Sequence, residues 1–149
     1  MKNVLIIEDD SFKSDNLATF LKANIGNANI SLASDVASGV SAVERKIFDL
    51  IIIDMALPSH PVVSGGGAPM SLLSGGLEIL FELRSLDRTD FCIIVTQYPE
   101  VEISGNYFPV EKAAAAIKTH FDCDVGACIE YAEASNAWKF ELINLIKNI

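Results

Sequence analysis

Residues 4–10 have the sequence VLIIEDD, in which a short apolar run is followed at once by acidic residues. The pattern returns at residues 50–54, where LIII precedes Asp54, and a third apolar run, residues 92–95, precedes Thr96. Short continuous apolar runs rich in β-branched side chains are typical of strands buried on both faces of a parallel sheet. These runs therefore predict the central strands of such a sheet.

Amphipathic segments alternate with the apolar runs. Four apolar residues with helical spacing follow the acidic cluster: Phe12, Leu17, Phe20 and Leu21. Strands that alternate with helices form βαβ units, which place helices on both faces of a doubly wound α/β sheet. The expected strands are residues 4–7, 30–33, 50–54, 91–96 and 127–132. The expected helices are residues 12–24, 35–46, 77–86, 110–121 and 137–147.

The length and the charge of the chain limit its architecture and its partners. Its 149 residues predict a single domain, 1–149, because one domain typically holds about 100–150 residues. The net charge is −9, and Arg45-Lys46 is the only adjacent basic pair. A nucleic-acid-binding surface requires clustered lysine and arginine, so nucleic acid is not an expected partner.

Targeting patterns and cysteine usage indicate the compartment. The N-terminal residues lack a secretory signal pattern, and no apolar run approaches the length of about 20 residues that spans a membrane. The three cysteines are odd in number and two of them lie in apolar runs, which favours buried free thiols over disulfides. We therefore expect a cytoplasmic protein that does not contact a membrane.

Acidic residues fall where expected strands end. Glu8 and Asp9 follow the first strand, and Asp54 ends the third. In a doubly wound sheet such strand ends open onto one crevice, where the strand order reverses. Carboxylates brought together there repel one another, which raises their pKa values or recruits a cation, and Mg²⁺ suits an all-oxygen site. Acidic residues also end strands and cap helices without further function. It is the presence of acidic residues at the ends of both the first and the third strand that indicates a site.

Several of these residues form motifs that resemble those of bacterial response-regulator receiver domains. Residues 6–10, IIEDD, resemble the acidic cluster of that family. Residues 54–58, DMALP, resemble its phosphorylation-site motif, an Asp followed three and four residues later by Leu-Pro. Gly76 resembles the glycine at the start of the next helix, and Thr96 matches the family's hydroxyl residue. The resemblance covers nearly the whole chain.

The resemblance implies a fold and a set of residue roles. The fold would be flavodoxin-like, with a five-stranded parallel sheet of order 2-1-3-4-5. Asp54 would be the phosphoryl acceptor, and Thr96 would donate a hydrogen bond to the phosphoryl oxygen. Asp9 would ligate Mg²⁺ directly and Glu8 largely through water. Asp54 would share the metal, and the backbone carbonyl of Ala56 would complete the set.

The resemblance also implies a function and its partners. The chain would take a phosphoryl group from a phosphohistidine on a histidine kinase or phosphotransfer protein. It would be no enzyme beyond its own phosphorylation and dephosphorylation. Because the chain ends at Ile149, directly after the last expected helix, its output would be contact with a downstream effector protein, as a monomer or weak dimer. Two alternatives stay open: a pseudo-receiver that binds partners without phosphorylation, and a Mg²⁺-dependent phosphohydrolase.

The end of the last strand departs from the family pattern. Receiver domains place a lysine there, but residues 128–135, CIEYAEAS, contain none. Glu133 or Ala134 falls in its place. Three other lysines are candidates for a substitute: Lys112, Lys118 and Lys139. If no ammonium faces the phosphoryl group, the charge of Asp54 should be coupled only weakly to the rest of the domain.

Two connections are longer than usual. Residues 59–75 form a glycine-rich insertion in the loop after the third strand, which lacks the Gly-Lys dipeptide of a phosphate-binding loop. It is expected to be either a flexible flap or a partner contact beside the acidic site. Residues 97–109, in the region that changes shape in the family, are also extended. Tyr131 is either the switch aromatic of the last strand or a buried core residue.

Overall fold

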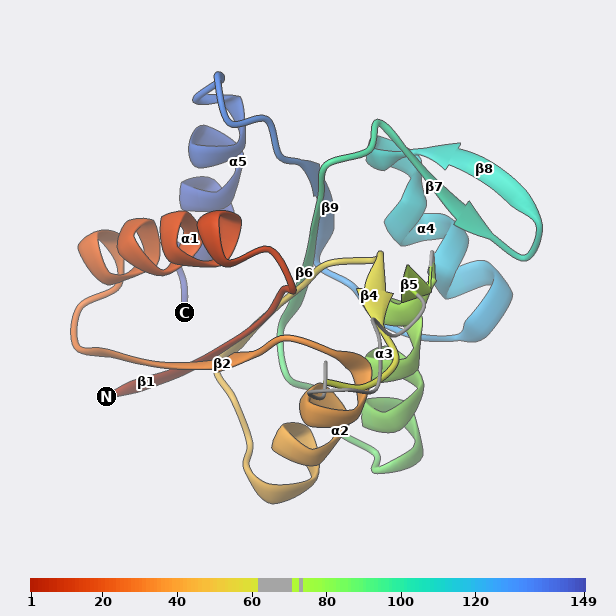
Figure 1. The fold of residues 1–149 in the computed structure, drawn as a ribbon, viewed down its shortest axis with the longest axis horizontal. Coiled ribbons are helices and arrows are strands. Elements are labelled where there is room, and N and C mark those ends of the chain that lie inside the picture. Colours follow the sequence, from red (N-terminus) through yellow and green to blue (C-terminus); the bar gives the residue numbers. More distant parts are fainter. Residues whose placement is uncertain (62–70, 73) are drawn as a thin grey trace.

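The computed structural model describes residues 1–61, 71–72 and 74–149, and its centre is a five-stranded parallel sheet of order β2-β1-β3-β6-β9 (Figure 1). The strands are β1 (Lys2–Ile7), β2 (Ala28–Ala33), β3 (Leu50–Ile53), β6 (Cys92–Thr96) and β9 (Ala127–Glu130). The helices are α1 (Ser11–Asn24), α2 (Val36–Arg45), α3 (Gly75–Ser85), α4 (Val110–Phe121) and α5 (Ala137–Ile146). Counted along the parallel strands alone, this is the predicted flavodoxin-like order.

Helices cover both faces of the sheet (Figure 1). Successive strand residues point to opposite faces, so the β1 residues Leu5 and Ile7 pack with α2, α3 and α4, whereas Val4 and Ile6 pack with α1 and α5. Every residue of β3 and β6 is buried. This burial on both sides is the physical reason why the central strands are continuous apolar runs.

The first turn of α1 differs from the predicted amphipathic pattern. Phe12 was expected on the buried face, but its side chain is 58% exposed, whereas Lys13 is 0% exposed. Asp10 caps the helix, because its carboxylate accepts hydrogen bonds from the backbone N–H groups of Phe12 and Lys13. The cap sets where the helix begins, and the helix then directs Lys13 rather than Phe12 toward the sheet.

A hairpin that was not predicted follows the fourth strand of the parallel sheet. Strands β7 (Glu100–Ile103) and β8 (Asn106–Pro109) pair antiparallel around Ser104 and Gly105, whose φ angles are 52° and 80°. Positive φ at both loop residues is characteristic of the tight hairpin turn whose twist matches that of the strands. Val101 and Ile103 are buried in the main core, so the hairpin is an integral layer over α4.

Most of the predicted insertion at residues 59–75 lies outside the described residues. Its ends are linked by a short antiparallel pair, β4 (Leu57–Pro58) with β5 (Ser71–Leu72), directly before α3. Among the helices of the described residues, none has the length and hydrophobicity needed to cross a bilayer.

Candidate functional site

The carboxyl ends of three neighbouring strands meet at one edge of the sheet. Ile7 at the end of β1 is in register with Ile53 of β3, and Ile53 is in register with Ile94 of β6. The residues that follow these positions therefore face the same crevice. They include three of the predicted site residues: Glu8 after β1, Asp54 after β3 and Thr96 at the end of β6.

Three carboxylates meet in this crevice. Glu8, Asp9 and Asp54 each offer an oxygen atom, and these atoms all lie within 4.8 Å of one another. Glu8 is 5% exposed and Asp54 is 7% exposed, whereas Asp9 is exposed to solvent. Burial, reinforced by the neighbouring charge of Asp54, raises the pKa of Glu8 to about 8, and burial also raises the pKa of Asp54. The cluster is therefore short of positive charge, as expected for carboxylates arranged around a cation.

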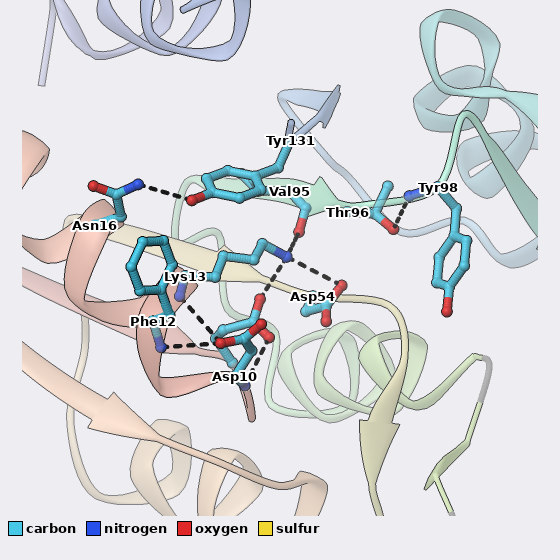
Figure 2. Close-up of polar contacts among 10 residues, drawn as sticks. Asp10, Phe12, Lys13, Asn16, Asp54, Val95, Thr96, Tyr98 and Tyr131 are labelled. Atoms are coloured by element: carbon cyan, nitrogen blue, oxygen red, sulfur yellow. Dashed lines mark hydrogen bonds and ion pairs between the residues drawn. The ribbon is translucent and has the colours of Figure 1, made fainter. Parts of the chain in front are cut away.

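A buried ammonium lies beside the two buried carboxylates (Figure 2). Lys13 Nζ is 2.5 Å from Glu8 Oε1, a contact that is an ion pair without hydrogen-bond geometry, and 3.5 Å from Asp54 Oδ1. It also donates a 2.8 Å hydrogen bond to the carbonyl oxygen of Val95. A single side chain from α1 thus connects β1, β3 and β6.

Lys13, which was not among the predicted substitutes for the missing lysine, places an ammonium beside the acidic cluster. The proposed substitutes lie elsewhere: Lys112 is exposed, Lys118 pairs on the surface with Asp122 and Asp124, and Lys139 lies over the Trp138 ring. Strand β9 ends at Glu130, and the following Glu133 and Ala134 are exposed in a turn. The sequence does carry one signal for Lys13, because a lysine in the first turn of a helix opposes the helix dipole and needs another reason to be there.

The loop after Asp54 is held close to the start of α3. The backbone N–H of Gly76 donates to the Met55 carbonyl at 2.9 Å. A Cβ atom added at Gly76 would lie 2.5 Å from the Asp54 carbonyl oxygen, so only glycine permits this approach. Ala56, whose carbonyl was predicted to ligate the metal, follows in the same loop and is half-buried.

Thr96 forms the other wall of the crevice. It is 1% exposed, and its Oγ1 accepts a hydrogen bond of 3.3 Å from the backbone N–H of Tyr98. Beyond it lies a cavity of about 330 Å³ between the site and the hairpin. Its walls include Met55, Thr96, Tyr98, Val101 and Tyr107. Tyr98 and Tyr107 are 53% and 66% exposed, so this wall offers aromatic surface to solvent.

Tyr131 is buried on the α1 side of the site. It is 4% exposed, and its hydroxyl oxygen accepts a 2.8 Å hydrogen bond from Asn16 Nδ2 (Figure 2). Lys13 Nζ lies 5.5 Å from the centre of the Tyr131 ring, and that ring packs against Trp138 with 5.0 Å between ring centres. Of the two predicted roles, this structure has Tyr131 as a core residue.

Comparison with known proteins identifies the family. No protein-family model matches the chain. The chain is 34% identical over 148 residues to the Detocs response regulatory protein DtcB of Vibrio alginolyticus, an alignment that covers 97% of this chain and 99% of that protein. The chain therefore belongs to the response-regulator receiver family, a family of signalling modules.

Solved structures show the same fold. A CheY-like receiver domain from Methanospirillum hungatei JF-1 superposes with a TM-score of 0.65 at 20% identity, covering 99% of this chain and 91% of that one. The response regulator TrrA of Thermotoga maritima, solved in complex with Mg²⁺ and BeF, superposes with a TM-score of 0.62 at 18% identity. That alignment covers 98% of this chain and 100% of TrrA.

Proposed function

We propose that this receiver domain accepts a phosphoryl group on Asp54 from a phosphohistidine of a partner protein in a phosphorelay. The observation that supports the proposal most directly is the clustering of Glu8, Asp9 and Asp54, with oxygen atoms within 4.8 Å of one another at the end of the central strands. Burial raises the pKa values of Glu8 and Asp54, so these two carboxylates do not stabilise the fold by being buried together. Their placement side by side therefore favours a functional site.

The chemistry is a transfer between two nucleophiles. An Asp54 carboxylate oxygen forms a new bond to phosphorus while the bond between phosphorus and the histidine nitrogen breaks. The imidazole nitrogen leaves with the electron pair and takes up a proton from solvent, and nothing is oxidised or reduced. Such a transfer depends on positioning and charge neutralisation rather than on covalent help from the protein. Thr96 Oγ1 donates a hydrogen bond to the phosphoryl oxygen.

The residues suit a divalent cation. Carboxylate oxygens from Glu8, Asp9 and Asp54, with the backbone carbonyl of Ala56, form the all-oxygen set that Mg²⁺ prefers. When bound, Mg²⁺ neutralises the charge between the anionic acceptor and the anionic donor. The complex of TrrA with Mg²⁺ and BeF supports this assignment.

The partners follow from this chemistry. The donor would be a histidine kinase or a phosphotransfer protein, and the output would be contact with a downstream effector protein. We infer that the domain 1–149 acts in the cytoplasm, as a monomer or weak dimer, and that residues 59–75 are a glycine-rich insertion in its sequence.

The pseudo-receiver remains a second candidate. The observation that favours it is the ion pair of Lys13 with Glu8 and Asp54, which neutralises part of the acidic cluster without any phosphoryl group. Under this alternative the domain would bind its partners in one fixed state.

Incubation with acetyl phosphate separates the two candidates. With Mg²⁺ the protein should gain one phosphoryl group that hydroxylamine removes, as expected of an acyl phosphate, and chelation of the metal should prevent the gain. Asp54→Asn should abolish labelling, because an amide is a poor nucleophile, whereas Asp15→Asn on the exposed face of α1 should not. A folded protein that stays unlabelled would support the pseudo-receiver, and labelling of Asp54→Asn at another residue would contradict the assignment.

A further inference from the structure

Helix α1 supplies a fully buried cation to the site. The Lys13 side chain is 1% exposed, and its Nζ reaches Glu8, Asp54 and the Val95 carbonyl, which belong to different strands. Val95 directly precedes Thr96, the residue proposed to contact the phosphoryl oxygen. The ammonium therefore lies between the acceptor strand and the strand that carries the hydroxyl.

The contacts of the Lys13 ammonium differ in length. An ammonium has three N–H donors. One donates to the Val95 carbonyl at 2.8 Å, and Nζ also forms an ion pair with Glu8 Oε1 at 2.5 Å. The distance to Asp54 Oδ1 is 3.5 Å, which exceeds the usual hydrogen-bond range of about 2.7–3.2 Å. Among the described residues, the donor on the Asp54 side thus has only this long contact, at the oxygen pair where a phosphoryl group would be attached.

Burying the Lys13 ammonium costs free energy of desolvation, so its position indicates a function for the charge. A buried ion pair contributes little net stability, because desolvation offsets the attraction between its charges. Apolar side chains already fill the α1 layer, where Leu17 and Leu21 are 0% exposed. A purely structural role would be met equally well by apolar residues in place of Lys13 and both of its carboxylate partners.

Resting on the proposed function, we propose that Lys13 contacts the phosphoryl group on Asp54, so that α1 supplies the ammonium that the end of β9 lacks. The contact would be a charge-assisted hydrogen bond to a phosphoryl oxygen, with Glu8 and the Val95 carbonyl holding the ammonium in position. Asn16 lies one turn further along α1 and donates to the Tyr131 hydroxyl, so the same helix links the acceptor to the α5 side of the molecule.

A test on the unmutated protein uses the lysine ammonium itself as the probe. Beryllofluoride serves as the phosphoryl mimic, and nitrogen NMR of lysine side chains follows each Nζ while fluorine NMR shows the bound mimic. With Mg²⁺ present, the Lys13 Nζ resonance should shift on addition of beryllofluoride, whereas that of the surface residue Lys118 should not. A bound mimic with an unchanged Lys13 resonance would overturn the inference.

A variant then measures the strength of the contact. Lys13→Met should weaken binding of beryllofluoride by about 10- to 100-fold, the range expected for one hydrogen bond to a charged group. Its Mg²⁺ affinity should not fall, because the variant removes a competing cation from Glu8 and Asp54. Lys118→Met is the matched control and should bind both ligands as the unmutated protein does.

The outcomes separate this inference from the proposed function. Equal affinity of Lys13→Met and the unmutated protein for beryllofluoride would overturn the role of Lys13 alone. An equal loss of Mg²⁺ affinity would also overturn it, because the effect would then arise at the metal. If the unmutated protein bound no beryllofluoride with Mg²⁺, the proposed function itself would fail.

Discussion

The two sides of the Asp54 site are built differently. On the α1 side, buried polar groups form a connected set, in which Lys13 pairs with Glu8 and Asp54 and Asn16 binds Tyr131. On the hairpin side, one hydroxyl, that of Thr96, faces a cavity and exposed tyrosines. Figure 2 shows the contrast, with Lys13 reaching toward Asp54 from α1 and Tyr98 lying beyond Thr96 on the other side of the site.

The difference indicates which part of the domain responds to a change of charge at Asp54. Charges interact more strongly where burial lowers the effective dielectric constant, and the buried charge lies on the α1 side. The hairpin is held by its own backbone pairing and by the buried residues Val101 and Ile103. We therefore expect the response to phosphorylation to extend through α1 to Tyr131 and Trp138 rather than to Tyr107.

The expectation of weak coupling from the sequence rested on the absence of an ammonium. Lys13 supplies a buried ammonium whose Nζ lies 5.5 Å from the centre of the Tyr131 ring, so weak coupling is no longer expected for Tyr131. For Tyr107 the expectation stands, since the hairpin side has no comparable buried charge among the described residues.

The largest effect on stability is expected from Lys13→Met in the metal-free protein above about pH 8, where Glu8 is ionised. Removing one partner leaves Glu8 and Asp54 buried without a counter-charge, which should cost about 3–5 kcal/mol of unfolding free energy. Urea denaturation measures this, and adding Mg²⁺ should restore part of it. Lys112→Met, at an exposed position of α4, is the control and should change stability by no more than about 0.5 kcal/mol. Equal effects of the two variants would remove the distinction between the sides.

The pH dependence of the unfolding free energy of the metal-free protein should reveal the titration of Glu8, on the α1 side of the site. The pKa of Glu8 is raised from 4.5 to about 8, so the folded state holds a proton that the unfolded state has lost. The contribution of this group to stability is thus full below pH 4.5 and is lost as the pH rises to about 8. The stability difference between the unmutated protein and Glu8→Gln should decline across that window in urea titrations. A difference that is constant with pH would contradict the assignment.

A smaller effect is expected at the glycine behind the acceptor. Gly76→Ala would place a methyl group 2.5 Å from the Asp54 carbonyl oxygen. The loop or the start of α3 must shift, at a cost of about 1–3 kcal/mol, and labelling by acetyl phosphate should slow. Gly26→Ala is the matched control, because nothing lies within 4 Å of its added methyl group. Comparable losses from both variants would show that Gly76 has no special relation to Asp54.

The smallest effect should come from Asn16→Ala. Loss of one hydrogen bond to Tyr131 costs about 0.5–1.5 kcal/mol, so the fold should survive. The variant should nevertheless reduce the change in Trp138 fluorescence on binding of beryllofluoride, since Tyr131 packs against Trp138. Tyr107→Ala on the hairpin side should leave that signal intact. The reverse pattern would place the response on the hairpin side.

Local sequence determined the fold and the acidic half of the site. Apolar runs such as residues 50–53 can be buried only between two layers, and carboxylates at their ends must meet once the strands are parallel neighbours. The hairpin was missed although Ser104-Gly105 between alternating apolar residues is a turn signal.

The burial of Lys13 beside the acidic cluster was determined by the tertiary structure. In the sequence Lys13 is one lysine next to Phe12, and apolar periodicity favoured Phe12 as the buried residue. The N-cap at Asp10 determines which residue of the first turn faces the sheet, and the carboxylates of Glu8 and Asp54 make burial of an ammonium possible there. A lysine in the first helical turn is unusual, but no local pattern shows which groups bind it, because those groups lie at the ends of three strands that become neighbours only when the sheet is assembled.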